Sequence, residues 1–199
     1  MSAFRSLIAV SVVVAAPLAA QVGGFGFQLV KAVKDDDRGA FNKIIADRSR
    51  LNAAVLDYVS DGETALHVAV RTNNRAFVND LLYYRANPNV LNAAGDTPLI
   101  LAVMAGNQDL AELLLRGRAG LDFANRRGET ALIKAVNAHS FEMVRFLLGK
   151  GADPDRADRF GGKSARQYAL DHPRFTTIVK ALSDAPRKSA RPVSGPKLN

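Results

Sequence analysis

Hydrophobic and polar positions along the chain repeat with a period of 33 residues. The pentapeptide GETAL occupies residues 62–66 and again residues 128–132, and GDTPL occupies residues 95–99, midway between the two copies. Each copy opens a stretch with apolar residues three and four apart, and a second such stretch with a Leu-Leu pair follows it. This spacing is typical of amphipathic helices. Each period therefore predicts a helix–turn–helix unit.

Residues at the ends of the predicted helices support this interpretation. A threonine, favoured at N-caps, stands before each first helix, and Pro98 suits the first turn of its helix. Asn73 and Gly106 follow the first helices, and both residue types adopt the positive φ that stops a helix. One unit cannot bury its apolar faces alone, so the units are expected to stack into a solenoid. The predicted caps are Thr64, Thr97 and Thr130, and the small residues at close helix contacts are Ala69, Ala102 and Ala135.

The combined motif resembles the ankyrin repeat. That family has a 33-residue period and a Thr-Pro-Leu-His-x-Ala motif, and this chain has Pro98 in one copy, His67 in another and GADP at residues 151–154. No single copy holds the complete motif, but the three copies are in phase. The resemblance implies an all-α ankyrin-repeat solenoid with short β-turn loops that binds a protein on its concave surface. It also implies that His67 joins adjacent loops by hydrogen bonds.

The pattern extends on both sides to about five modules within residues 29–183. The first module is degenerate, with four extra residues in its following loop, and residues 21–28 form a glycine-rich lead-in whose phenylalanines are expected to pack on it. The last module is offset by one residue, and its polar Arg166, Gln167 and Lys180 predict a terminal cap with one solvent-exposed face. The predicted modules are residues 29–57, 58–91, 92–124, 125–158 and 159–183.

Residues 1–20 have the pattern of a secretory signal peptide. Arg5 supplies a positive start, residues 7–16 are apolar, and the small residues that follow predict cleavage after Ala20. The alternative is a membrane anchor, but the apolar run of 14 residues is shorter than the roughly 20 that a spanning helix needs. We therefore expect export to the periplasm of a Gram-negative bacterium, with secretion to the medium or a host as the alternative.

The charge of the chain is concentrated in its terminal segments. The formal net charge is +8, but residues 21–184 hold 22 basic against 19 acidic residues. This nearly neutral array gives no support to nucleic-acid binding, which needs a basic stripe. The tail at residues 184–199 is predicted to be disordered, and its charge allows weak contact with an anionic envelope surface. The chain has no cysteine, so its fold rests on packing, and we expect a monomer.

Two short patterns come close to ligand-binding loops. ADRFGGKS at residues 157–164 resembles a phosphate-binding P-loop, but Ala157 replaces the first glycine of that motif. The same residues are in phase with the repeat, which explains them without a nucleotide. DPDRAD at residues 153–158 lacks the glycine and glutamate of a calcium loop, and acids at these places are expected to cap turns. We predict no cofactor and no metal.

The histidines offer no catalytic arrangement. His67, His139 and His172 fall at helix and turn positions of separate modules, so they are not expected to converge. No Ser–His–Asp order and no cysteine nucleophile can be assembled. The chain is therefore predicted not to be an enzyme.

The resemblance also implies where a partner binds. The concave surface of an ankyrin array consists of loop tips and first helices, and the residue between the repeated Gly and Thr is expected to face outward. Tyr83 and Tyr84 are expected to pack between modules. The predicted function is a non-catalytic periplasmic interaction scaffold; the alternatives are a secreted effector that engages a host protein and an envelope-binding protein that uses its basic tail. The predicted partner-binding residues are Asp61, Glu63, Arg71, Thr72, Asp96, Met104, Arg126, Arg127, Glu129, Asn137, Phe160, Lys163, Asp171 and His172.

Overall fold

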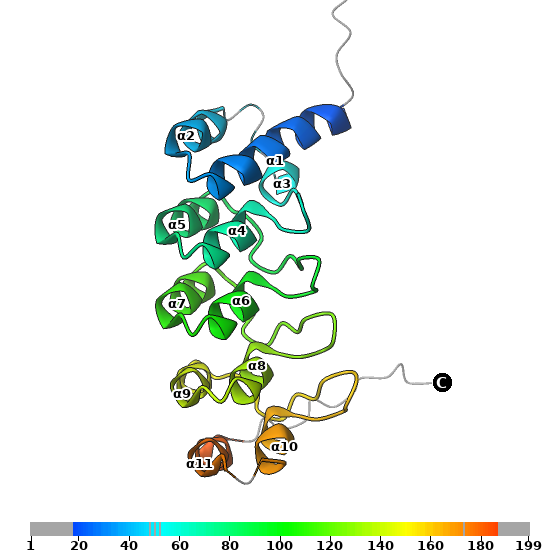
Figure 1. Cartoon of the computed structure of the whole chain (residues 1–199), viewed down its shortest axis with the longest axis vertical. Helices are drawn as coiled ribbons and strands as arrows, with labels where there is room; N and C mark the ends of the chain where they lie inside the picture. The colour runs from blue at the N-terminus through cyan, green and yellow to red at the C-terminus, as the bar shows by residue number, and fades with distance from the viewer. Residues whose placement is uncertain (1–17, 48, 50, 52, 173, 187–199) are drawn as a thin grey trace, which may run out of the picture.

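The computed structural model describes residues 18–47, 49, 51, 53–172 and 174–186. These residues form eleven α-helices, and they contain no strand beyond one isolated bridge between Ser60 and Glu63. The helices stand in two columns along the length of the molecule (Figure 1). The inner column contains α1 (Leu18–Lys34), α4 (Ala65–Arg71), α6 (Pro98–Met104), α8 (Ala131–Asn137) and α10 (Ala165–Leu170). The outer column contains α2 (Arg38–Ala46), α5 (Arg75–Tyr83), α7 (Gln108–Arg116), α9 (Phe141–Gly149) and α11 (Thr176–Asp184).

Four inner helices begin at a threonine or serine cap, and the three threonine caps are those that the sequence predicts. Thr64, Thr97 and Thr130 have an extended backbone, and each side chain accepts a hydrogen bond from the amide three residues on. Ser164 caps α10 in the same way, and Pro98 is the first residue of α6. These caps pair amides that the first turn of a helix leaves without partners.

The inner helices end in a shared left-handed turn. Asn73 has a φ of 55°, and its amide and the next one bond to carbonyls in the last turn of α4. Gly106 and His139 take the same place after α6 and α8, with φ of 66° and 57°. This is the Schellman arrangement, so the predicted helix stops at Asn73 and Gly106 are confirmed. Asp36 closes α1 with the same bonds, which gives the degenerate first module the geometry of the others.

Alanines line the contacts between successive inner helices. Ala69, Ala102, Ala135 and Ala169 have no exposed surface, and the inner helices pack in chain order from α1 through α4, α6 and α8 to α10. Small side chains allow neighbouring helices to approach closely. The core is therefore a continuous strip in which each module covers the next.

Four loops project from one side of the inner column, immediately before α4, α6, α8 and α10 (Figure 1). We name them after the modules that they open. Finger 2 is residues 59–63, finger 3 is residues 92–96, finger 4 is residues 125–129 and finger 5 is residues 158–163.

Backbone hydrogen bonds join each finger to the next. A glycine near each tip has a left-handed backbone, and at Gly128, with a φ of 82°, an added Cβ would lie 2.5 Å from the amide nitrogen of Arg159. The repeated glycine is therefore needed both for its backbone conformation and for the close approach of the next finger. The donor and acceptor pairs are Ala93 to Gly62 (2.7 Å), Arg126 to Gly95 (2.9 Å) and Arg159 to Arg127 (3.1 Å).

The N-terminal region contains more helix than the sequence suggests. Helix α1 begins at Leu18, so the predicted lead-in is helical, and the helix continues through Ala20, the predicted cleavage point. Phe25 packs against the core as expected, whereas Phe27 is exposed. The loop after α2, where four extra residues are predicted, contains the short helix α3 (Ala53–Leu56), which packs on α1. Cleavage itself stays a prediction.

Parts of two predicted segments lie outside the described residues. These parts are residues 1–17 of the predicted signal peptide and residues 187–199 of the predicted basic tail. Within the described part of the chain, no helix combines the length and the apolar character needed to cross a membrane.

The last module is closed by Arg166. Its guanidinium donates hydrogen bonds to the carbonyls of Leu182 and Ala185 and to the carboxylate of Asp155. Gln167 and Lys180 are exposed, as expected for a terminal cap, but the Arg166 side chain is only 14% exposed. The long side chain folds over the end of α11 instead of facing solvent, because its donors pair with carbonyls that the helix leaves free.

Candidate protein-binding face

The predicted binding residues lie in two rows, one on the fingers and one at the C-terminal ends of the inner helices. Ion pairs join the rows, from Glu63 to Arg71 (2.9 Å) and from Lys163 to Asp171 (2.7 Å). The rows therefore share one surface, which we call the inner face. The finger row contains Asp61, Glu63, Asp96, Arg126, Arg127, Glu129, Phe160 and Lys163, and the helix row contains Arg71, Thr72, Met104, Asn137, Asp171 and His172.

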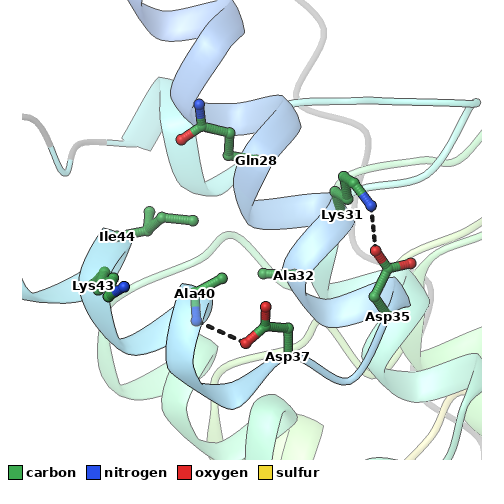
Figure 2. Close-up of a pocket in the computed structure, with 8 residues that line it drawn as sticks. All are labelled: Gln28, Lys31, Ala32, Asp35, Asp37, Ala40, Lys43 and Ile44. Carbon is green, nitrogen blue, oxygen red and sulfur yellow. Dashed lines mark hydrogen bonds and ion pairs between the residues drawn. The ribbon is translucent and has the colours of Figure 1, made fainter.

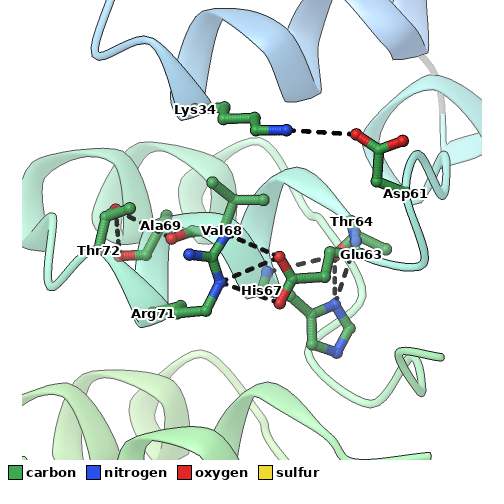
Figure 3. A network of polar contacts seen from close by, with 9 residues as sticks. All are labelled: Lys34, Asp61, Glu63, Thr64, His67, Val68, Ala69, Arg71 and Thr72. Carbon is green, nitrogen blue, oxygen red and sulfur yellow. Dashed lines mark hydrogen bonds and ion pairs between the residues drawn. The ribbon is translucent and has the colours of Figure 1, made fainter. Parts of the chain in front are cut away.

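Charges at the N-terminal end of the inner face are paired with one another (Figure 3). The carboxylate of Glu63 accepts hydrogen bonds from two nitrogens of Arg71, and this contact raises the pKa of Arg71 above its usual value. Lys34 of α1 reaches Asp61 on finger 2 at 3.3 Å. Because at least one group of each pair is largely exposed, each pair contributes at most about 1 kcal/mol to stability. Their main effect is to neutralise this end of the face.

His67 is buried near these pairs and joins the start of α4, directly after finger 2, to finger 3. Its Nε2 lies 3.2 Å from the carbonyl oxygen of Asp96, which can only accept, so this nitrogen carries the proton. Its Nδ1 then accepts a hydrogen bond from the amide of Thr64 (3.3 Å). Burial lowers the pKa of His67, against hydrogen bonds and nearby acids that raise it. The predicted role of His67 in joining adjacent loops is confirmed.

The middle of the inner face carries a buried carboxylate. Asn125 donates to the carboxylates of Asp96 (2.8 Å) and Glu129 (3.0 Å), and Lys134 lies 3.5 Å from Glu129. The Glu129 residue is only 7% exposed. The expectation that the residue between Gly and Thr faces outward is therefore wrong for Glu129. It pairs with Asn125 and holds finger 4 together instead of presenting a charge.

Fingers 4 and 5 present arginines that have no close acidic partner. Arg126 and Arg159 are exposed, and no ion pair to either is present among the described residues. Arg126 donates one N–H to the carbonyl of Ala93 (3.2 Å), and Arg127 lies 3.9 Å from Glu129, at the limit of an ion pair. The basic charge of the inner face is therefore concentrated at its C-terminal end.

Phe160 stands at the tip of finger 5 and is 79% exposed. The guanidinium of Arg127 lies 5.8 Å from the centre of its ring. One carboxylate oxygen of Asp158 accepts hydrogen bonds from the amides of Phe160, Gly161 and Gly162, at 3.0, 2.7 and 3.0 Å. Finger 5 is therefore an ordered loop that holds a large apolar side chain in solvent.

The amides of finger 5 explain the P-loop-like sequence. In a P-loop such amides surround a phosphate, whereas here they surround the carboxylate of Asp158, which also accepts a hydrogen bond from the Tyr168 hydroxyl. Burial raises the pKa of Asp158, but these hydrogen bonds outweigh it and hold the pKa below its usual value. The hydrogen bond to Asp158 raises the pKa of the Tyr168 hydroxyl to about 12. The carboxylate of Asp158 therefore occupies the place that a bound phosphate takes in a P-loop.

The helix row contains apolar, polar and charged side chains. Met104 and Asn137 are exposed, and Met104 adds a second apolar side chain to the inner face. The Thr72 hydroxyl donates to the carbonyl of Val68 (2.9 Å), so this side chain is used by the end of α4. His172 lies at the turn after α10.

Two of the histidines come together, contrary to expectation. The rings of His139 and His172 lie 6.1 Å apart, and both contact the ring of Phe175. They meet because corresponding turns of adjacent modules stack on each other. Within the described residues, no group of three side chains has the arrangement of a metal site.

The predicted turn caps replace the calcium-loop interpretation of residues 153–158. Asp153 accepts a hydrogen bond from the amide of Asp155 (3.0 Å), and Asp122 accepts one from the amide of Asp153 (2.8 Å). Asn89 and Asp57 make equivalent bonds to the module that follows each of them. These side chains join modules along the array.

The outer column differs from the prediction at one position. Tyr83 is 72% exposed, whereas Tyr84 is partly buried and packs against the core. The expectation that both pack between modules is therefore wrong for Tyr83. It lines a shallow groove between α2 and α5 together with Phe41 and Ile45.

A small pocket lies between α1 and α2 (Figure 2). Lys31 and Asp35 on its rim form an ion pair, and Asp37 accepts a hydrogen bond from the amide of Ala40 and caps α2. The charged groups of Lys31, Asp35 and Asp37 are therefore engaged within the first module itself. The inner face is the stronger candidate for binding.

Comparison with known proteins supports the family suggested by the sequence. Residues 66–158 match a family model described as ankyrin repeats, in three copies. The fold is an all-α ankyrin-repeat solenoid. No curated protein matches the chain. Ankyrin repeats are generic protein–protein interaction modules and are typically non-catalytic, which supports a binding scaffold with a protein partner.

Two exposed residues were not predicted from the sequence, Arg159 on the inner face and Leu170 at the end of α10. Arg159 lies 33 residues after Arg126 and occupies the same place on the next finger, so the repeat period alone would identify it. Leu170 is 67% exposed. It aligns with Val136 once the one-residue offset of the last module is applied, and its exposure follows from the lack of a further described module.

Proposed function

We propose that this protein is a non-catalytic scaffold, exported to the periplasm, whose inner face binds a partner protein. The observation that carries the proposal is that the fingers share one backbone structure but differ in the side chains at their tips. Glycines and caps fix the backbone by lateral hydrogen bonds, while the tips display different side chains from one module to the next. Fixed backbones with variable tips suit recognition, because little conformational entropy is lost on binding.

The composition of the inner face supports a protein partner. Phe160 and Met104 are exposed, and arginines stand among them. Aromatic residues, Met and Arg are enriched in the cores of protein–protein interfaces. Acids at Asp61, Asp96 and Asp171 divide the positive charge, which disfavours a long polyanion.

The proposed export rests on the sequence of residues 1–20. Their positive start, short apolar segment and small residues form the pattern of a cleaved signal. Secretion as an effector toward a host protein is the alternative destination. Fractionation of cells that produce the full chain separates the two, since a periplasmic pool supports the scaffold and a pool in the medium or the host supports the effector.

Site-specific photo-crosslinking in the producing cells tests binding by the inner face. A photoreactive phenylalanine analogue is placed at Phe160 or Met104 of the full chain, and a control copy carries it at Tyr83, an equally exposed residue of the outer column. We expect a discrete protein adduct from the inner-face positions and none from Tyr83. Adducts at Tyr83 alone, or at no position, would overturn the proposal. Deleting residues 185–199 tests the tail, because unchanged envelope association excludes tail-driven binding.

A further inference from the structure

The two ends of the inner face differ in how their charges are satisfied. At the N-terminal end, Arg71 pairs with Glu63 and Lys34 pairs with Asp61. At the C-terminal end, the described residues offer no carboxylate within ion-pair distance of Arg126 or Arg159. Arginines on adjacent fingers that lack acidic partners favour an anionic partner, because a negative group that binds there offsets their mutual repulsion.

The backbone brings these arginines together on adjacent fingers. The Arg159 amide donates to the carbonyl of Arg127 at 3.1 Å, and Arg126 is the neighbour of Arg127 in the chain. Gly128 allows this approach, since a side chain there would collide with Arg159. The three arginines therefore belong to one joined pair of loops, and the Arg126 guanidinium also donates to the Ala93 carbonyl of finger 3.

An apolar side chain stands within the same cluster. Phe160 follows Arg159 directly, and its ring lies beside the guanidinium of Arg127. Asp158 holds the loop through three amides, so the backbone position of Phe160 is fixed by the fold. Because the backbone that carries the exposed ring is already ordered, binding loses little backbone entropy.

We propose that Arg126, Arg127, Arg159 and Phe160 form a docking site for an acidic segment of a partner protein that places an apolar side chain beside its carboxylates. Arginine binds carboxylates in a two-pronged geometry, and an aromatic anchor surrounded by arginines has the composition of an interface hot spot. The inference rests on the proposed binding function and specifies the chemistry of the partner.

Charge distribution favours a peptide over a nucleic acid at this site. A nucleic acid needs a continuous basic stripe, but Asp158 and Glu129 lie directly behind the arginines and Asp171 neutralises Lys163. Three arginines around one ring match a short acidic segment with one apolar residue. Binding of a nucleic acid at this site is one of the results that would contradict the proposal.

Selection from a random dodecapeptide library displayed on phage tests the proposal. The immobilised full chain is the target, at physiological salt. We expect enriched peptides with an excess of Asp and Glu around an aromatic or aliphatic residue. Arg126→Glu, Arg127→Glu and Arg159→Glu combined, and Phe160→Ala alone, should each weaken binding of a selected peptide by at least about tenfold.

A matched triple variant controls for net charge. Arg75→Glu, Arg116→Glu and Arg145→Glu make the same charge change on three outer helices, and binding should change by less than about twofold. Circular dichroism confirms that both triple variants are folded. The proposal is overturned if no acidic peptides are enriched, if both triple variants bind equally, or if a single-stranded oligonucleotide displaces the peptide as well as soluble peptide does.

The two proposals fail in distinguishable ways. If crosslinks form at Phe160 while the selected peptides show no acidic preference, the scaffold stands and the acidic-segment inference fails. If crosslinks form at no inner-face position, the binding function itself fails.

Discussion

The same position of the inner helix is buried in the interior modules and exposed in the last module. Val70, Val103 and Val136 are each at most 2% exposed, whereas Leu170, their counterpart in α10, is 67% exposed. Each valine is covered by the inner helix of the module that follows, as α4, α6, α8 and α10 pack in order. The burial of a residue in this array is therefore set by its neighbour and not by its own module.

The finger glycines show the same difference. A Cβ on Gly62, Gly95 or Gly128 would meet the next finger at 2.4–2.5 Å, whereas a Cβ on Gly162 would meet nothing within 4 Å. All four have a positive φ. The backbone conformation is thus common to all four fingers, while the need for space belongs only to the fingers that another finger follows in the described part of the chain.

Gly128→Ala is expected to have the largest effect on stability. It combines a backbone strain of about 1 kcal/mol with a collision against the backbone of Arg159, for a total of about 3 kcal/mol or more. Gly162→Ala carries the strain alone and should cost about 1 kcal/mol. Urea unfolding of the two variants measures the difference, and equal midpoints would contradict the role assigned to the next finger.

Val136→Ala and Leu170→Ala form a second pair. Removing buried methyl groups at Val136 should lower the free energy of unfolding by on the order of 2 kcal/mol, because a cavity remains between α8 and α10. Leu170→Ala removes more apolar volume but should change stability by less than about 0.5 kcal/mol, since its surface is already in water. Thermal unfolding followed by circular dichroism compares them. A larger loss for Leu170→Ala would mean that something covers this residue in solution.

The outer helices allow a test in the stabilising direction. Arg118 follows α7 with a φ of 69°, where Gly151 follows α9 with a φ of 86°. Arg118→Gly removes the strain of a side chain in the left-handed region and should raise stability by up to about 1 kcal/mol. Gly151→Arg is the reciprocal control and should lower it. Two changes of the same sign in urea unfolding would show that the left-handed backbone is not the cause.

His67 distinguishes the second module from the two that follow, which have Ile100 and Ile133 in its place. Burial lowers the pKa of folded His67 below its usual 6.5, so the unfolded chain binds the proton first as the pH falls. The free energy of unfolding should be at its full value above pH 6.5 and decrease below it. Comparing wild type with His67→Ile at pH 7.5 and pH 5 measures this contribution. If the free energy of unfolding falls equally in both proteins between pH 7.5 and pH 5, His67 is not the cause of the decrease.

The repeat period made the helix caps, the helix-ending turns and the helix contacts of this molecule predictable. Thr64, Gly106 and Ala135 have local backbone or packing roles that recur every 33 residues, so three copies identify each role. The exposure of Phe160 and Met104 was predicted for the same reason. Positions of fixed geometry can be recognised from residue type, because few residue types satisfy them.

The sequence was less informative where the exposure of a side chain depends on partners that the repeat pattern does not specify. Glu129 is buried because Asn125 and Lys134 lie beside it, and Arg166 is covered because it reaches the end of α11. His139 and His172 meet only when their turns stack. Such contacts depend on how far each side chain reaches and on which groups the fold places beside it, and the spacing of residues along the chain gives neither.

The lateral hydrogen bonds between fingers also bear on local opening. Finger 4 is bonded on both sides, to Gly95 and to Arg159, whereas among the described residues finger 5 is bonded to a neighbouring finger only through Arg127. In a linear stack, a unit held from one side opens at a lower free energy than a unit held from both. Amide hydrogens of α10 and α11 therefore exchange with solvent before those of α6 and α8. Phe160 is displayed by the unit that opens first, and a partner that binds the closed form slows that exchange.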